Sequence, residues 1–344
     1  MQYGYTEHFA SPLHGRALEE LKILLSKAGL TYATGIQHTA LVRDLDDRII
    51  AAASLEKNVI KCVVCDPEHQ GENLTAAVLT PLRRKAMEEG IRHLFLYTKP
   101  ENIYLFSGLG FYEVARAGEA ALMEDRRDGF AAWAESVRSP DAKGTIGSLV
   151  MNCNPMTLGH RYLVEQASAC CDFLYIFVVS EDKSAVPAAD RLSLVKCSLS
   201  GLPDAAITGT ADYLISSATF PDYFLKDKTR SGQVWTKLDA AVFCRLAQQL
   251  GITRRFVGSE PFCPVTASYN QTLAQVLPRH GVELTELPRL ERDGTAISAT
   301  AVRKLVQSGQ WEKIQSLVPS PVYEWFANTE NRSQFLERSR VISV

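Results

Sequence analysis

The sequence predicts an α/β protein with two domains, a mixed-sheet domain followed by a doubly wound parallel sheet. Its 344 residues are enough for two domains at about 100–200 residues each. In the first 123 residues, strand patterns adjoin one another across short turns, as in a mixed sheet. From residue 145 on, strand and helix patterns alternate, which implies right-handed crossovers between parallel strands.

The first domain, residues 1–123, contains apolar residues at helical spacing and apolar runs typical of strands. Leucines at helical spacing between Gly15 and Ala28 predict a helix that stops at Gly29, because glycine commonly follows a helix end. Apolar runs at 39–42 and 49–54 flank an acidic turn and predict a β-hairpin. The later elements are a strand at 58–65, a helix at 71–89, a strand at 91–97, a short helix at 101–109 and a strand pair from Phe111 onward.

A charged segment, residues 124–144, follows the first domain. It ends in Ser-Pro-Asp-Ala-Lys-Gly at residues 139–144, a composition typical of a loop. We interpret the segment as a helix followed by a linker, so the second domain spans residues 145–344.

The second domain begins with a buried-type strand at 145–151 and alternates from there. The further strands are expected at 172–180, 206–208, 254–258 and 282–287. The helices are expected around 162–167 and at 187–199, 234–250, 268–280 and 298–308. This order predicts a doubly wound, Rossmann-like sheet, which binds its ligand beyond the carboxyl ends of the strands, at the switch point. The HUP type of this sheet is what the resemblance given below implies.

Composition excludes several function classes. The 37 basic and 39 acidic residues give a formal charge of −2, which argues against non-specific nucleic-acid binding as the main role. The apolar run 173–179 is far shorter than the roughly 20 residues that cross a bilayer, and no secretory signal is recognisable, so we expect no membrane association. Eight cysteines without such a signal indicate reduced thiols and a cytoplasmic protein.

Metal-ligand patterns are weak in this sequence. Cys62 and Cys65 have CxxC spacing, but they lie in a predicted strand, where residues three apart face opposite sides. The histidines at 38, 69, 93 and 280 have no metal-like spacing. We therefore expect no protein metal site.

The loop Asn154-Pro-Met-Thr-Leu-Gly-His160 follows the first strand of the second domain and opens its first helix. Free amides at a helix start receive phosphate well, and Gly159 permits close approach. His160 can donate to phosphate oxygens and stabilise charge at a phosphorus under attack, and Asn154 is expected to hydrogen-bond the α-phosphate. If the loop stood alone, helix capping with an incidental histidine would be the better explanation.

A second motif accompanies it. The first loop resembles the HxGH signature of the nucleotidylyltransferase superfamily, with Thr157 at the first histidine position, where its hydroxyl can donate but carries no charge. The segment Ile297-Ser-Ala-Thr-Ala-Val-Arg303, about 140 residues later, resembles the ISSTxxR motif of the same superfamily. Ser298 is a natural helix N-cap, and Thr300 lies beside it as a candidate nucleotide-binding residue. Arg303 offers paired donors to the β- and γ-phosphates.

Other candidates also follow strands of this sheet. Lys183 is assigned to neutralising the triphosphate or the acid substrate, with a solvated loop lysine as the equal alternative. Gly258 begins the turn up to Phe262, which is expected to frame the adenine or the Mg²⁺–phosphate region. We favour a structural role for Arg191, and packing for Cys153, because no base for a thiol nucleophile can be identified.

Three segments of the first domain carry a further resemblance: Val64-Cys-Asp-Pro67 leading to Gln70-Gly71, then Lys99-Pro-Glu-Asn102, then Leu105-Phe-Ser-Gly-Leu-Gly-Phe111. Together they resemble a GCN5-related acetyltransferase (GNAT) domain. A glycine-rich turn before a helix exposes amides to a pyrophosphate, so Gly71 is a candidate cofactor-binding residue. The chain departs from the pattern at Asn73, where the family has a second small residue.

The two halves together resemble the citrate lyase ligase family, to about Phe326. The most family-like segments are 152–166, 179–183 with 187–191, and 258–264. The resemblance implies that ATP, with Mg²⁺, activates acetate as acetyl-AMP. The acetyl group then passes to the prosthetic-group thiol of the citrate lyase acyl carrier subunit, with release of AMP and diphosphate. His160, Thr157, Lys183 and Arg303 are the implied catalytic residues.

The role of the first domain and the reaction itself leave alternatives open. The CoA-like groove of the first domain could dock the nucleotide end of the carrier's prosthetic group. The alternative reaction is nucleotidylyl transfer to a phosphorylated small molecule. An acetyltransferase with a regulatory nucleotide domain is disfavoured by Asn73, and a non-catalytic adaptor by the presence of His160 and Arg303.

Overall fold

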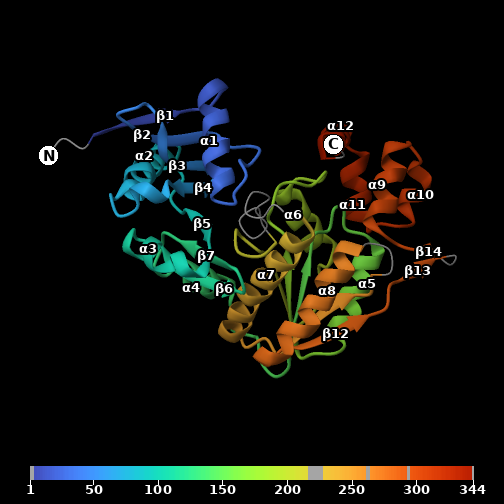
Figure 1. Ribbon diagram of the computed structural model, residues 1–344. Coiled ribbons are helices and arrows are strands. Elements are labelled where there is room, and N and C mark those ends of the chain that lie inside the picture. The colour runs from blue at the N-terminus through green and yellow to red at the C-terminus, as the bar shows by residue number, and fades with distance from the viewer. Residues whose placement is uncertain (1–3, 216–227, 261–263, 293–294, 343–344) are drawn as a thin grey trace. The chain divides into compact units, whose positions relative to one another are not determined.

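The computed structural model describes residues 4–215, 228–260, 264–292 and 295–342 (Figure 1). The chain divides into two compact units: unit 1 comprises residues 1–129 and 218–238, and unit 2 comprises residues 130–217 and 239–344. Helix α4 (Gly129–Val137) begins at this division, and helix α7 (Lys228–Leu250) has its first part in unit 1 and the rest in unit 2. The domain boundaries expected near residues 123 and 145 stay predictions.

Unit 1 is a seven-stranded sheet in the order β1-β2-β3-β4-β5-β7-β6. The strands are β1 (Tyr5–Ala10), β2 (His38–Asp44), β3 (Ile49–Glu56), β4 (Val59–Cys65), β5 (Phe95–Thr98), β6 (Tyr112–Ala117) and β7 (Ala120–Glu124). Its helices are α1 (Gly15–Lys27), α2 (Leu74–Glu88) and α3 (Ile103–Gly108). Every residue of β3 is buried, and both α1 and α2 contact this strand. The sheet is therefore mixed and covered by helices, as the GNAT resemblance implies.

Strands β4 and β5 form the only parallel pair among the strands described in unit 1. Their pairing is limited to Val59 with Phe95 and Ile60 with Leu96, although β4 continues to Cys65. The pairing of β3 with β4 shifts register near Ala52, which marks an irregularity beside Cys62, whose φ is +53°. The two parallel strands thus separate toward the end of β4 that leads to Gly71.

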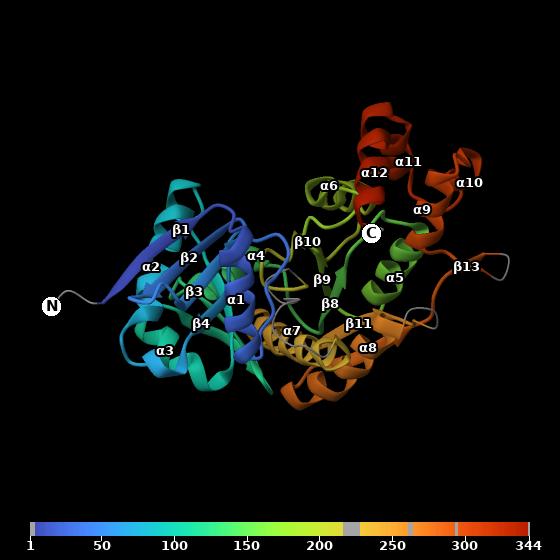
Figure 2. The same ribbon diagram turned by 45° about the horizontal axis from the view of Figure 1, so that its top comes forward.

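Unit 2 contains a parallel five-stranded sheet in the order β10-β9-β8-β11-β12 (Figure 2). Its strands are β8 (Ile146–Met151), β9 (Phe173–Val178), β10 (Ala205–Gly209), β11 (Arg254–Gly258) and β12 (Glu283–Leu287). The chain runs outward from β8 to β10 and then returns to β11 on the other side of β8. The carboxyl ends of β8 and β11 therefore meet at the switch point, where such sheets bind ligands.

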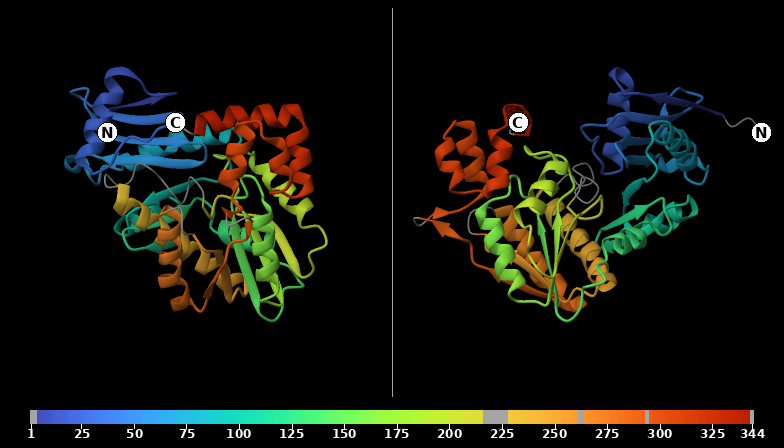
Figure 3. Two further views of the ribbon diagram at one scale, coloured as in Figure 1. Left: turned by 90° about the vertical axis from the view of Figure 1, so that its right-hand side faces the viewer. Right: turned by 180° about the vertical axis from the view of Figure 1, so that it is seen from behind.

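Helices cover both faces of this sheet, as Figure 3 shows. The helices are α5 (Leu158–Ser168), α6 (Ala188–Ser198), α8 (Pro264–Val276), α9 (Ala299–Gln307), α10 (Trp311–Gln315), α11 (Ser320–Ala327) and α12 (Thr329–Ile342). One core joins α5, α6 and α9–α12 to the sheet. On the other face, Arg255 of β11 lies against Phe243 of α7 and Tyr269 of α8. In the first core, the fully buried rings of Phe326 and Phe335 meet edge to face with centroids 5.1 Å apart.

The predicted α/β class and the doubly wound parallel sheet are confirmed, and strand β11 matches its prediction at both ends. Helix α2 begins at Leu74, three residues after the predicted start, because Gly71 and Asn73 both adopt positive φ. The helix predicted at 268–280 begins at Pro264 and ends in a separate 3₁₀ turn. The sequence analysis missed β1, the short pair β13 (Glu291–Arg292) and β14 (Thr295–Ala296), and helices α10–α12.

Candidate functional site

Helix α5 begins directly after the loop that follows β8, and Thr157 is its N-cap. The Thr157 hydroxyl accepts a hydrogen bond from the backbone N–H of His160 over 3.3 Å. In return, the backbone N–H of Thr157 donates to Nδ1 of His160 over 3.0 Å. This reciprocal capping box satisfies helix-start amides and fixes the imidazole to the loop. The Thr157 side chain is fully buried, and its hydroxyl lies 2.9 Å from Nδ1 of His160; its implied catalytic role stays a prediction.

The hydrogen bonds of His160 determine its protonation. Because Nδ1 accepts a hydrogen bond, the neutral ring carries its proton on Nε2. Burial of the ring, and secondarily the positive charge of Arg289, lower the pKa of His160 to about 4. At neutral pH His160 is therefore an uncharged donor through Nε2.

The two sequence motifs are in direct contact. A Cβ atom on Gly159 would lie 2.6 Å from the carbonyl oxygen of Ile297, so only glycine lets helix α5 approach this backbone. Arg303 extends from α9 to the first loop, where its Nη1 donates to the carbonyl oxygen of Asn154 over 2.7 Å. The glycine expected to allow close approach of a nucleotide is thus required already for packing between the motifs.

The second motif forms the start of helix α9. Ser298 is the N-cap, as predicted, and its Oγ accepts a hydrogen bond from the N–H of Ala301. One turn later, Nη2 of Arg303 donates to Oγ1 of Thr300 over 2.9 Å. Burial lowers the pKa of the Arg303 guanidinium from its ordinary value, although arginine stays protonated at any physiological pH. The helix start thus presents a fixed cation beside the loop after β8.

Arg289, which the sequence analysis did not single out, adds a second cation. It follows β12, and its Nε donates to the carbonyl oxygen of Ser259, which follows β11, over 2.6 Å. Its Nη2 forms an ion pair with Glu260. Its charge acts on His160, as the lowered pKa of that histidine shows. Its position just past a strand of the parallel sheet is the signal that could have identified it.

Gly258 ends β11 at the same edge of the sheet. Its carbonyl oxygen accepts a hydrogen bond from Asn270 of α8, and a Cβ on this glycine would only touch Leu163 at 3.8 Å. Space therefore does not require glycine at this position. The rest of the predicted turn, residues 261–262, lies outside the described residues.

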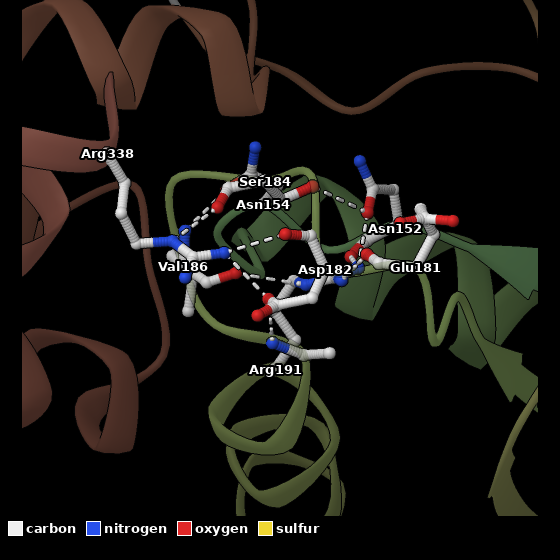
Figure 4. A network of polar contacts seen from close by, with 9 residues as sticks. Asn152, Asn154, Glu181, Asp182, Ser184, Val186, Arg191 and Arg338 are labelled. Carbon is white, nitrogen blue, oxygen red and sulfur yellow. Dashed lines mark hydrogen bonds and ion pairs between the residues drawn. The ribbon is translucent and has the colours of Figure 1, made fainter. Parts of the chain in front are cut away.

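The loop after β9 carries Lys183, which is exposed. The loop is hydrogen-bonded to the loop after β8, since the N–H of Val186 donates to Oδ1 of Asn154 over 2.9 Å (Figure 4). The fully buried Arg191 donates to the carbonyl oxygens of Asn152 and Glu181 over 2.9 and 2.5 Å. Arg191 therefore has a structural position, joining the loops after β8 and β9. The Oδ1 of Asn154 accepts the hydrogen bond from Val186 within the protein, and the expected contact of Asn154 with the α-phosphate stays a prediction.

In unit 1, the turn before α2 contains two residues with positive φ. Gly71 has φ +92° with nothing within 4 Å of an added Cβ, and Asn73 is the N-cap of α2 in the left-handed conformation. The Asn73 side chain makes no cap hydrogen bond. A glycine is thus needed at position 71 for its conformation, and the space beside it is open.

Among the described part of the chain, no three His, Cys, Asp or Glu side chains are grouped as metal ligands. In residues 4–215, 228–260, 264–292 and 295–342, no helix combines the length and apolar character needed to cross a bilayer. The seven cysteines described, which exclude Cys263, are free thiols.

Two solved structures resemble parts of the chain. An acyl-CoA N-acyltransferase from Pseudomonas aeruginosa is 16% identical, with 36% of this chain and 98% of that chain covered and a TM-score of 0.30. The Thermotoga maritima protein TmcAL, bound with α-thio ATP, is 13% identical, with 55% of this chain and 57% of that chain covered and a TM-score of 0.36.

Comparison of sequences identifies the family. Residues 146–326 match the family model described as the citrate lyase ligase C-terminal domain. The [citrate [pro-3S]-lyase] ligase of Klebsiella pneumoniae is 42% identical over 81% of this chain and 84% of its own length. The protein of the same name from Escherichia coli K12 is 39% identical over 86% of this chain and 84% of its own. The resemblance expected from the sequence is confirmed, and the chain belongs to the citrate lyase ligase family of enzymes.

Proposed function

We propose that this chain is an ATP-dependent acid–thiol ligase that activates acetate as acetyl-AMP. It then acetylates the prosthetic-group thiol of the citrate lyase acyl carrier subunit. One observation carries the proposal: Arg303 of the second motif bonds to the carbonyl oxygen of Asn154 in the first. Both motifs therefore lie at one loop beside the switch point, the place where sheets of this kind bind nucleotides.

In the first step, a carboxylate oxygen of acetate attacks the α-phosphorus of ATP. The bond from this phosphorus to the bridging oxygen breaks in line, and diphosphate leaves with its electron pair. The neutral Nε2–H of His160 donates to a non-bridging α-phosphate oxygen, and Thr157 holds the ring through Nδ1. Arg303, Arg289 and Lys183 neutralise the departing diphosphate.

In the second step, the carrier thiol attacks the acetyl carbonyl carbon of acetyl-AMP. A carbon–sulfur bond forms, the anhydride carbon–oxygen bond breaks, AMP leaves, and the thiol proton passes to water. Neither step requires a nucleophile from the protein, since positioning and charge stabilisation suffice. This agrees with Cys153, whose pKa burial raises to about 12, well away from a reactive thiolate.

The magnesium ion enters as part of the substrate MgATP. Mg²⁺ at such sites is held mainly by phosphate oxygens and water, with few protein ligands. We place the protein in the cytoplasm, because its seven described cysteines are unpaired thiols.

For unit 1, we propose that the turn before α2 docks the pyrophosphate of the carrier's CoA-like prosthetic group. Support comes from the open space at Gly71 and from the amides at the start of the 15-residue helix α2. Strands β4 and β5 pair only at Val59 with Phe95 and Ile60 with Leu96, and they separate toward this turn.

Exchange of labelled diphosphate into ATP tests the first step without the carrier. We expect exchange that requires acetate, together with acetyl-AMP detectable by mass spectrometry. His160→Ala should lower the exchange rate by on the order of 10²–10³. The matched control is Arg161→Ala, which removes only a solvent-exposed ion pair with Glu165. Exchange that proceeds without acetate but requires a phosphorylated small molecule would instead establish a nucleotidylyltransferase.

A further inference from the structure

The loop at 181–187, which carries Lys183, is held from two sides. On one side, Arg191 of helix α6 donates to the carbonyl oxygens of Glu181 and Val186. From the other side, a second arginine, Arg338 of helix α12, reaches the same loop (Figure 4). The two guanidinium groups thus donate hydrogen bonds to backbone carbonyl oxygens of one short loop.

Arg338 makes three hydrogen bonds to this loop. Its Nε donates to the carbonyl oxygen of Ser184 over 2.9 Å. Its Nη2 donates to the carbonyl oxygen of Asp182 over 2.9 Å and to the Asp182 carboxylate over 2.7 Å. The same carboxylate oxygen accepts the N–H of Ala188 at the start of α6. Arg338 therefore holds the residues on both sides of Lys183.

Helix α12 is itself fixed to the core of unit 2. Phe335, one turn before Arg338, is fully buried against Phe326 of α11. The arginine lies beyond residues 146–326, which match the family's C-terminal domain. It occupies a helix of which the sequence motifs give no indication.

We propose that Arg338 is a positioning residue for the nucleotide site. It acts through the loop at 181–187 and keeps Lys183 at the carboxyl edge of β9, where the triphosphate of the proposed function is bound. The bonds go to two carbonyl oxygens and one carboxylate in fixed directions, so the geometry of a guanidinium is needed as well as its charge. The N–H of Val186 in this loop donates to Asn154 in the loop after β8. Loss of order in the loop at 181–187 therefore also removes a contact of the loop after β8.

Two measurements on the full-length chain test this proposal. Amide hydrogen exchange without nucleotide reports on the loop directly, because the N–H groups of Val186 and Ala188 donate to Asn154 and Asp182. In Arg338→Ala both amides should exchange at least about tenfold faster, with the core amides of β8 and β9 unchanged. Steady-state kinetics should show KM for ATP raised about tenfold and kcat within about twofold. Arg338→Lys should restore only part of this loss.

The matched control is Arg340→Ala, an exposed arginine two residues further along α12. It should change neither amide exchange nor KM. If Val186 and Ala188 exchange at the wild-type rate in Arg338→Ala, Arg338 does not position the loop at 181–187. Full rescue by lysine, or an equal effect of Arg340→Ala, would overturn the proposal in the same way. A faster-exchanging loop with unchanged KM would overturn its role in nucleotide binding. The role in nucleotide binding rests on the proposed function. If the wild-type chain shows no acetate-dependent diphosphate exchange, that function fails. The amide hydrogen exchange of Val186 and Ala188 still decides whether Arg338 holds the loop.

Discussion

The backbone N–H of Thr157 donates a hydrogen bond to Nδ1 of His160 over 3.0 Å, and the Thr157 hydroxyl lies 2.9 Å from the same nitrogen. A loop backbone, which no side-chain substitution removes, therefore determines which nitrogen of the imidazole carries the proton. Thr157 stands where the usual HxGH signature has its first histidine. Here this residue orients His160, the second histidine of the signature.

The first prediction concerns the Thr157 hydroxyl. Thr157→Val keeps the shape of the side chain but removes the cap, so the free energy of unfolding should fall by about 1 kcal/mol. The acetate-dependent exchange rate should fall with it, because the imidazole loses one of its two contacts with residue 157. Thr157→Ser keeps the hydroxyl and should restore most of both. Chemical denaturation and diphosphate exchange are the measurements, and a valine variant with full activity would contradict the positioning role.

The second prediction concerns pH. His160 has a pKa of about 4 in the folded chain, against about 6.5 in an unfolded one. Between these values the unfolded chain binds more protons, so the stability contributed by the neutral ring is present above about pH 6.5. It is lost as the pH falls through about 4. NMR titration of the His160 ring should show no inflection near 6.5, and Arg289→Met should move its inflection upward.

The matching stability measurement compares the wild type with His160→Gln. Between pH 6.5 and 4, the wild-type free energy of unfolding should decline more steeply than that of the variant. Parallel curves would show that the ring is not held neutral by the fold.

The third prediction concerns Gly159. An alanine Cβ would lie 2.6 Å from the Ile297 carbonyl oxygen, so Gly159→Ala should force the two motifs apart and cost about 1–3 kcal/mol of stability. Gly258→Ala, with its nearest contact at 3.8 Å, should leave the melting temperature almost unchanged. Thermal unfolding of both variants is the test. Equal melting temperatures would remove the packing explanation for Gly159.

The fourth prediction separates the two steps of the reaction. Gly71→Glu introduces a carboxylate and a strained Cβ at φ +92° in the turn before α2. Acetylation of the carrier should fall at least about tenfold through charge repulsion with a pyrophosphate, while acetate-dependent exchange stays unchanged. The control is Gly90→Glu, at the other end of α2, where φ is +78° and the surroundings are equally open. Loss of carrier acetylation in both variants would argue against docking at the turn.

Local patterns predicted much of the fold. Strand β11 and helix α9 are bounded by signals a few residues away, a preceding Gly251 and an N-cap serine, so their ranges could be predicted closely. Helix α10 has only five residues, and α12 is mostly polar, so neither shows a clear periodicity.

The site was predictable to the same extent. His160 and Arg303 lie in contiguous motifs, and both were identified. Arg289 and Arg338 depend on contacts with residues 29–30 and 154–156 positions away, which only the folded chain brings together. The sequence analysis identified Thr157 but could not predict that its side chain is buried. Burial depends on the segments that pack over the loop, and these are known only from the folded chain.

The bond between Arg303 and Asn154 spans 149 residues, and this has a consequence during synthesis. At about 5–20 residues per second, the loop after β8 leaves the ribosome on the order of ten seconds before the arginine that completes it. In that interval the nascent chain contains the loop after β8 without the guanidinium that donates to the carbonyl oxygen of Asn154. Under the proposed function, the nucleotide site is therefore complete only after Arg303 has been synthesised.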